Sequence, residues 1–226
     1  MINEARQTIL SAIRTHLAAS VPYDNFELAA HEDTAILSEA IAGLKPIDLF
    51  RQSLEAVDGR CVIANGESEV AQALTRIISD LQKTRLRAQR IAISDVPLVE
   101  RLMHLTDLEI EAMTVAPGAA EIFSFDVGIT TAQAGIAETG TLVLDGADER
   151  HRLVSLVPPV HIAIIDATRI VATLGEALTL LREGKEISPV VTFVTGPSRT
   201  ADIELTLTIG VHGPQELYVI INELGT

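Results

Sequence analysis

Glu138 is the residue best placed to do chemistry in a stretch of small and apolar residues that runs from Asp126 to Leu144. An ionised carboxylate that is taken out of water is costly unless it is paired or hydrogen-bonded. We therefore expect Glu138 to have partners, to lie at a strand end that faces a cleft, or both. In that position it is a candidate catalytic group, as a nucleophile or as an acid/base.

The neighbours of Glu138 have the types that allow close approach of a polar ligand. The glycines lack a Cβ atom, and the threonines place short hydroxyls next to the backbone. The predicted ligand-binding residues of this stretch are Thr130, Thr139, Gly140 and Thr141. The alternative is a tightly packed strand in which glycine admits a neighbouring element and Glu138 meets an internal arginine.

A second group of polar residues, Thr195 to Asp202, follows an apolar run that ends at Val194. In an open α/β sheet, ligands bind outside the carboxyl ends of the strands, where we expect this turn to fall. The predicted ligand-binding residues here are Gly196, Ser198, Arg199 and Thr200, with the Arg199 guanidinium as a planar fork for a carboxylate or phosphate. The alternative is a helix cap in which Arg199 pairs with Asp202, Glu204 or Glu138.

A third turn, Gly210 to Pro214, precedes the last apolar run and contains His212. We expect this turn to bring His212 to the same edge of the sheet as Thr195 to Asp202, where it would be a further ligand-binding residue. The competing interpretation is a structural histidine, and it applies equally to His104, His151 and His161.

The elements that must position these residues alternate between helical and strand patterns from Pro46 onward. This alternation predicts an α/β fold with a largely parallel sheet that is covered on both faces. Residues 1–45 read as an N-terminal helical extension and linker, with a helix over Asn3–Ala18, and residues 46–226 read as the main domain. Predicted helices are 47–57, 67–83, 97–103 and 174–182, and predicted strands are 60–64, 91–94, 108–113, 160–165, 190–195 and 216–222.

Composition excludes several classes of function. The formal charge of −14 repels polyphosphate backbones, so a nucleic acid is a poor partner. The only cysteine, Cys61, rules out a cysteine-rich zinc site or an iron–sulfur cluster held by this chain alone, and we expect no bound metal or cofactor. The apolar positions of residues 1–19 are interrupted by charges, so we expect no signal peptide or membrane span and a cytoplasmic location.

Four motifs resemble the LUD domain family, in particular its lactate utilization protein C members. The first runs from Asp126–Ala132 through Ile136–Leu144, and the others are Pro158–Ile162, Gly196–Ile203 and Gly210–Pro214. The resemblance covers roughly residues 46–222. It implies a three-layer, Rossmann-like sheet of the NagB/RpiA/CoA-transferase-like type, and it implies oxidation of L-lactate to pyruvate together with two iron–sulfur partner proteins.

Two hypotheses for the function follow. In the first, the chain is a non-redox subunit or accessory factor of an iron–sulfur complex that oxidises L-lactate, and it binds a small carboxylate or a partner surface. In the second, it is a free-standing enzyme that acts on a small activated or phosphorylated carboxylate through Glu138. The second draws on a similarity between Glu138-Thr139-Gly140 and the nucleophilic glutamate motif of CoA transferases.

Overall fold

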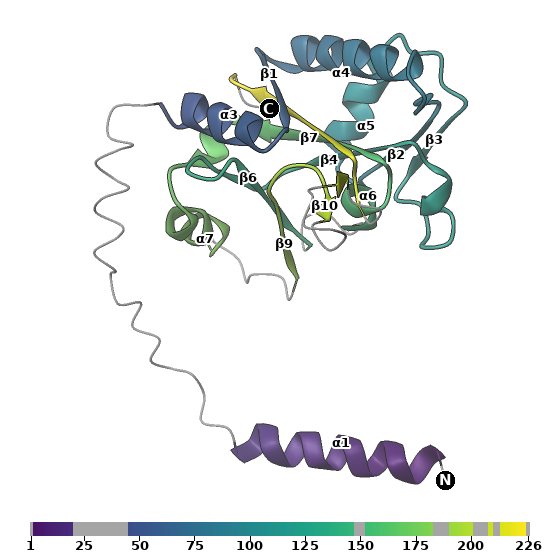
Figure 1. Cartoon of the computed structure of the whole chain (residues 1–226), viewed down its shortest axis with the longest axis vertical. Coiled ribbons are helices and arrows are strands. Elements are labelled where there is room, and N and C mark those ends of the chain that lie inside the picture. The colour runs from purple at the N-terminus through teal and green to yellow at the C-terminus, as the bar shows by residue number, and fades with distance from the viewer. Residues whose placement is uncertain are drawn as a thin grey trace. The chain divides into compact units, whose positions relative to one another are not determined.

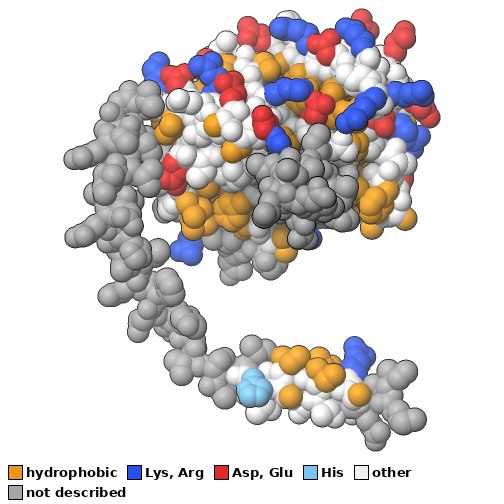
Figure 2. All heavy atoms as spheres, viewed as in Figure 1, with side chains coloured by type: hydrophobic (Ala, Val, Ile, Leu, Met, Phe, Trp, Pro, Cys, Tyr) orange, Lys and Arg blue, Asp and Glu red, His pale blue; other side chains and the backbone are white. Residues whose placement is uncertain are grey.

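The computed structural model describes residues 2–19, 45–146, 152–182, 190–200, 208–209 and 213–224. The chain divides into two compact units, Met1–Ala42 and Gly43–Thr226. The described part of the first unit is a single helix, α1 (Ile2–Ala19). Its apolar side chains gather on one side, where Ile9, Leu10 and Ile13 are exposed (Figure 2). The helix predicted over Asn3–Ala18 is thereby confirmed.

The larger unit alternates strands and helices along the chain. In order, its helices and 3₁₀ turns are α3 (Pro46–Ala56), α4 (Glu67–Gln82), α5 (Pro97–His104), η1 (Ile122–Ser124), α6 (Arg152–Leu156), η2 (Ala167–Arg169) and α7 (Leu174–Arg182). Its strands are β1 (Arg60–Ala64), β2 (Arg90–Ile93), β3 (Ala112–Val115), β4 (Val127–Thr131), β5 (Ala134–Ile136), β6 (Thr141–Asp145), β7 (Val160–Asp166), β8 (Ile170–Val171), β9 (Val191–Val194), β10 (Arg199–Thr200), β11 (Thr208–Ile209) and β12 (Glu216–Asn222).

The large sheet contains six strands in the order β1-β12-β7-β4-β2-β3. All neighbouring pairs in it are parallel. The inner strands read as continuous apolar runs because both of their faces are buried, as expected for a parallel sheet with covered faces. The predicted α/β class with a largely parallel sheet is confirmed.

One face of the large sheet is covered by α4 and α5 (Figure 1). The apolar residues of α4 recur at helical spacing, so Val70, Leu74 and Ile77 all reach the core beneath it. The helix α5 begins at Pro97, which suits the first turn of a helix because proline has no N–H to leave unpaired. These two helices therefore follow from patterns that the sequence shows directly.

The other face of the large sheet is covered by α3, α6 and a second, four-stranded sheet in the order β8-β5-β6-β9. Phe50 and Leu54 of α3 are fully buried against both sheets. The helix α7 packs on the far side of the small sheet through Ala177 and Leu181. Figure 1 shows α4 and α5 above the large sheet, with α7 and β9 below it.

The alternation of helices and strands predicts one largely parallel sheet, whereas the structure also contains a separate, four-stranded sheet. The stretch from Asp126 to Leu144 is shared between the sheets, because β4 belongs to the large one and β5 and β6 form an antiparallel hairpin in the small one. The strand predicted over 108–113 lies later, at Ala112–Val115. The helix α6 packs closely on β4 because Gly128 has no side chain: a methyl group on Gly128 would lie 1.9 Å from Val154 O.

Among the described helices, none combines the length and apolar character that crossing a membrane requires. On the face of the larger unit in Figure 2, acidic and basic side chains are interspersed, so this view shows no extended basic patch.

Candidate functional site

The C-terminal half of α3 contacts the tip of the β5–β6 hairpin. Ser53 Oγ donates a hydrogen bond of 3.5 Å to Glu138 O. Gly140 has a positive φ of 64°, and a methyl group on it would lie 2.3 Å from Leu54 N. The hairpin tip therefore needs glycine at position 140 for its backbone conformation and for its contact with α3.

Glu138 lies in this hairpin tip and caps the N-terminus of α7. Its Oε1 atom accepts a hydrogen bond of 3.0 Å from Leu174 N, and its own N–H donates to Ala172 O at 3.1 Å. The positive end of the helix dipole favours a carboxylate at this place. The prediction that Glu138 has partners is confirmed, and the partner of its carboxylate is a helix N-terminus.

A chain of three threonine hydroxyls lies next to Glu138. Thr141 Oγ1 is 2.7 Å from Thr139 Oγ1 and 2.7 Å from Thr195 Oγ1. Thr141 is buried, whereas Thr139 and Thr195 are exposed. The three hydroxyls come together because β6 and β9 are neighbours in the small sheet. The sequence predicted Thr139 and Thr141 as ligand-binding residues of one stretch. Thr195 was not among the predicted ligand-binding residues, because it only begins the turn that follows Val194.

The turn after β9 packs against the end of α3. Gly196 has a positive φ of 80°, and a methyl group on it would lie 2.7 Å from Val57 O. The Arg199 side chain then forms an ion pair with Asp58 in the turn that follows α3. Glu138 is therefore not the partner of Arg199 in this pair, and Asp202 and Glu204, the other two proposed partners, lie outside the described residues.

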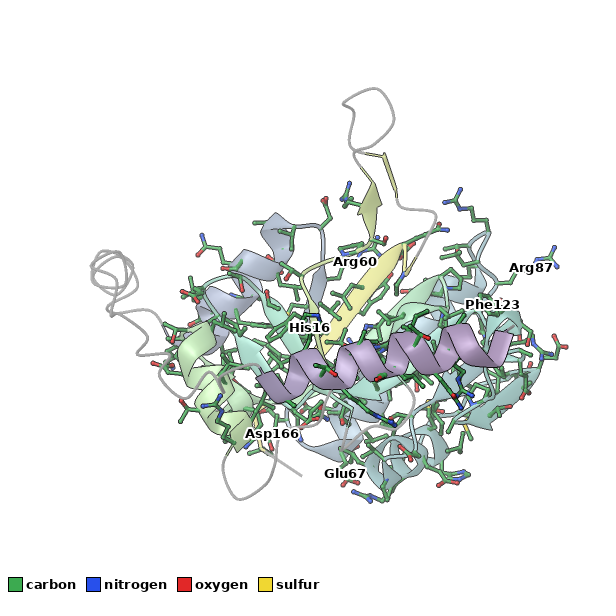
Figure 3. The ribbon with its side chains drawn as sticks, turned by 90° about the horizontal axis from the view of Figure 1, so that it is seen from below. His16, Arg60, Glu67, Arg87, Phe123 and Asp166 are labelled. Carbon is green, nitrogen blue, oxygen red and sulfur yellow. The ribbon has the colours of Figure 1, made fainter. Side chains whose placement is uncertain are left out.

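Arg199 therefore lies near the amino edge of the large sheet, because Asp58 is two residues before the start of β1. Figure 3 shows Arg60, the first residue of β1, on the opposite side of the molecule from Asp166, which ends β7, and from Glu67, which follows β1. The expectation that this turn falls at the carboxyl end of a parallel strand is wrong. The reason is that β9 belongs to the small sheet and runs antiparallel to β6.

Ser198 is placed by the loop before β12, since its N–H donates to Pro214 O at 2.8 Å. The backbone of Thr200 is in β10, opposite Thr208 of β11. The last predicted residue of the site, His212, lies outside the described residues. The structure thus brings Glu138, Thr139, Gly140, Thr141, Gly196 and Arg199 around the C-terminal end of α3.

Thr130 is separated from this group. It is 1% exposed in the centre of the large sheet, where its Oγ1 lies 2.9 Å from Nε2 of His161, a fully buried residue. Burial lowers the pKa of His161 to about 4, so the imidazole is neutral at physiological pH. Its Nδ1 atom has no hydrogen-bond partner among the described residues. Both side chains are closed off from a ligand in this conformation.

The chain's own thiol does not suit a metal or an iron–sulfur cluster. Cys61 is half-buried in β1, and burial raises the pKa of its thiol to about 12, so the thiolate that ligates metals is not formed at neutral pH. In the described part of the chain, no three side chains of histidine, cysteine, aspartate or glutamate gather in a way that could hold a metal ion.

The carboxyl edge of the large sheet carries polar groups that the sequence patterns did not single out. Asn222, at the end of β12, is buried and accepts a 2.8 Å hydrogen bond from Gly66 N. Glu67 at the start of α4 pairs with Arg101 of α5 through hydrogen bonds of 2.7–3.2 Å, which hold the pKa of the Glu67 carboxyl below its usual value. Only the pairing of distant elements reveals these contacts.

The group around α3 supplies one carboxylate, three linked hydroxyls and one guanidinium. Glu138 Oε2 makes no hydrogen bond with the described residues, so that oxygen is available to a ligand or a partner chain. Arg199 is already engaged by Asp58, so an anionic ligand must compete with that carboxylate. The arrangement suits binding of a small polar group or of a partner surface.

Comparison with known proteins identifies the family. The model of the LUD domain matches residues 47–222. A lactate utilization protein C from Exiguobacterium is 42% identical over 104 residues, which are 44% of this chain and 45% of that protein. The protein of the same name from Bacillus subtilis is 37% identical over 103 residues, or 43% of each chain. These matches span less than half the length of those relatives.

A solved structure supports the fold. The crystal structure of a DUF162 family protein from Deinococcus radiodurans superimposes with a TM-score of 0.57 and 22% sequence identity, over 78% of this chain and 95% of that one. At this identity the likeness concerns the fold alone. The family match extends over most of the larger unit and includes both sheets. This chain belongs to the LUD domain family.

Proposed function

We propose that this protein acts in lactate utilization, as a non-redox subunit or accessory factor of an iron–sulfur complex that oxidises L-lactate to pyruvate. The observation that carries the proposal is the match of residues 47–222 to the LUD domain, together with relatives that are named lactate utilization protein C. The fold is further proposed to be of the NagB/RpiA/CoA-transferase-like type, and the protein to be cytoplasmic.

The oxidation itself needs an electron acceptor outside this chain. Converting the C2 alcohol of lactate to the ketone of pyruvate releases two electrons and two protons. The single half-buried cysteine cannot ligate a cluster that would take those electrons. We therefore assign the electron-accepting clusters to partner chains and leave to this chain the binding of a ligand or of those partners.

The geometry around α3 favours a binding role over covalent catalysis. Glu138 is held by a backbone N–H at the start of α7, and Arg199 is held by Asp58. A side chain that caps a helix is held by its hydrogen bond to the helix N–H, and this limits its movement toward a substrate. The exposed residues Thr139 and Thr195 nevertheless present hydroxyls that are held by hydrogen bonds to Thr141, which suits recognition of a polar partner.

The proposal is tested by deleting the gene and measuring growth on L-lactate as the sole carbon source. We expect the deletion strain to fail to grow on L-lactate but to grow on pyruvate. Reintroducing the intact gene should restore growth on L-lactate. A tagged chain should then co-purify with iron and with L-lactate-oxidising activity, whereas the isolated chain should have neither. Normal growth of the deletion strain on lactate would sink the proposal.

A free-standing enzyme remains the second candidate, and the available Glu138 Oε2 is the observation that favours it. Such an enzyme would act on a small activated or phosphorylated carboxylate with Glu138 as nucleophile or acid/base. Incubating the isolated chain with acyl-CoA thioesters and following thioester loss tests this candidate. Turnover that disappears in Glu138→Gln supports it, and equal rates in both proteins exclude Glu138 as the nucleophile.

A further inference from the structure

A groove on the surface of the larger unit runs between α4 and the segment that follows α5. Ser68, Gln72 and Arg76 line it from α4, and Leu105 and Asp107 line it from the other side. Its volume is about 490 Å³, within the range of roughly 300–1,000 Å³ that is usual for small-molecule sites. The groove lies on the opposite face of the large sheet from the group around α3.

The α4 side of the groove is an elongated polar wall, because residues four apart on a helix share one face. The step from Ser68 to Arg76 is about 12 Å along the helix axis. Buried Ala71 belongs to the same lining, and the Leu105 side chain, which is 58% exposed, adds apolar surface from the other side. The groove thus combines polar groups with an apolar patch.

Two opposite charges in the groove have no ion-pair partner. Arg76 and Asp107 are both exposed, and their side chains form no ion pair or hydrogen bond with each other or with another residue in the described ranges. Nearby, by contrast, Glu67 of α4 and Arg101 of α5 join their two helices through hydrogen bonds of 2.7–3.2 Å. The Arg76 guanidinium and the Asp107 carboxylate are therefore available to a ligand, one from each side of the groove.

These groups select for a ligand that carries both charges. The arginine fork matches a carboxylate in a bidentate pair, and an aspartate accepts hydrogen bonds from an ammonium group. A purely anionic ligand would be opposed by the net charge of −14, and a purely cationic ligand would leave Arg76 without a partner. The side chains of Ser68 and Gln72 make no hydrogen bond with the described residues, so they can bond to further polar groups of the ligand.

We propose that this groove binds a zwitterion with an apolar body, either an apolar amino acid or a dipeptide of such residues. Its carboxylate pairs with Arg76, its ammonium pairs with Asp107, and its apolar body lies on Leu105 and Ala71. This binding goes beyond the proposed function, so normal growth of the deletion strain on lactate would leave it standing.

The test is calorimetric titration of the purified full-length chain, at low salt, with L-leucine and L-leucyl-L-leucine. Two analogues of leucine lack one charge each: isocaproate has no ammonium, and isoamylamine has no carboxylate. We expect the tighter-binding zwitterion to bind at least about tenfold more tightly than either analogue, because each analogue loses one charge-assisted contact. Which zwitterion binds more tightly identifies the ligand as a free amino acid or a peptide. Equal binding of all four compounds, or no heat from either zwitterion at millimolar concentration, would overturn the proposal.

Two variants assign the ends of the ligand. Arg76→Gln should weaken binding of the zwitterion by about tenfold but not that of isoamylamine, which has no carboxylate to lose. Asp107→Asn should weaken the zwitterion to a similar degree but not isocaproate. Arg85→Gln and Glu109→Gln, at exposed positions outside the groove, are the matched controls and should bind as the wild type does. Unchanged binding of the zwitterion in either Arg76→Gln or Asp107→Asn rejects the site.

Discussion

Arg199 forms an ion pair with Asp58, in the turn that ends α3, and not with Glu138. Glu138 instead accepts a hydrogen bond from the first N–H of α7. Glu138 and Arg199, the candidate catalytic carboxylate and the candidate anion-binding guanidinium, therefore each have a separate partner, and both lie along the C-terminal end of α3. A change at one of them does not strand a buried charge at the other.

The Arg199–Asp58 pair should contribute little to stability. Its side chains are 37% and 70% exposed, and exposed pairs are worth about 0–1 kcal/mol. We expect Arg199→Ala and Asp58→Asn each to lower the free energy of unfolding by at most about 1 kcal/mol in urea titrations. Asparagine is the right replacement because Asp58 has a positive φ of 63°, which asparagine tolerates. A loss several times larger would show that the pair is part of a buried network.

Glu138 should reveal its capping role in a pair of variants. Glu138→Gln keeps a side-chain acceptor and should leave stability nearly unchanged, whereas Glu138→Ala removes the cap of α7 and should cost about 0.5–2 kcal/mol. The control is Glu109→Ala on the surface, which should have almost no effect. A stable Glu138→Gln protein that fails to support growth on lactate assigns function to the carboxylate, and normal growth limits Glu138 to its structural role.

Gly140 should be the least replaceable of three glycines. Gly140→Ala combines a positive φ with a contact of 2.3 Å to Leu54 N, so we expect a loss of about 3 kcal/mol or more. Gly66→Ala has a positive φ of 82° but no heavy atom closer than 3.7 Å, and should cost about 1–2 kcal/mol. Gly118→Ala meets nothing within 4 Å and should change stability by less than about 0.5 kcal/mol. Any other ranking of the three unfolding free energies contradicts the packing of the hairpin on α3.

His161 should make the protein less stable in mild acid. Burial lowers the pKa of His161 from 6.5 to about 4 in the folded state. Between pH 6.5 and pH 4 the unfolded chain therefore binds a proton that the folded chain does not. Stability is thus complete above pH 6.5 and falls as the pH drops toward 4, by about 2 kcal/mol at pH 5. His161→Gln should flatten this dependence, while His104→Gln, at an exposed position, should retain it. Identical pH profiles for the wild type and His161→Gln would show that His161 is accessible to protons when folded.

The N-terminal unit is proposed to be separable from the rest. Because the chain divides at Ala42 and Gly43, deleting residues 1–42 should leave the cooperative unfolding transition of the larger unit intact. The exposed apolar side chains of α1 should matter for association instead, so sedimentation of the two proteins, alone and with any co-purifying partner, is the companion measurement. Loss of cooperative unfolding in the truncated protein would show that α1 completes the core.

The sequence by itself determined the local elements and the class of fold. The stripe of Val70, Leu74 and Ile77 predicts α4, the prolines at 46 and 97 mark helix starts, and the apolar run from Val160 predicts a buried strand. These signals depend on contacts within one element or on burial of a whole face. For that reason they can be read without knowing which elements become neighbours.

Tertiary structure alone decided how the candidate site is assembled. The division of residues 126–144 between two sheets, the partner of Arg199, and the meeting of Thr141 with Thr195 all depend on long-range pairing. An apolar strand pattern does not specify which sheet the strand joins, because the six-stranded and the four-stranded sheet both contain buried strands. The strand patterns predicted a carboxyl edge of one parallel sheet, whereas the antiparallel pairing of β6 with β5 and β9 in the small sheet brings both Glu138 and Arg199 to the C-terminal end of α3.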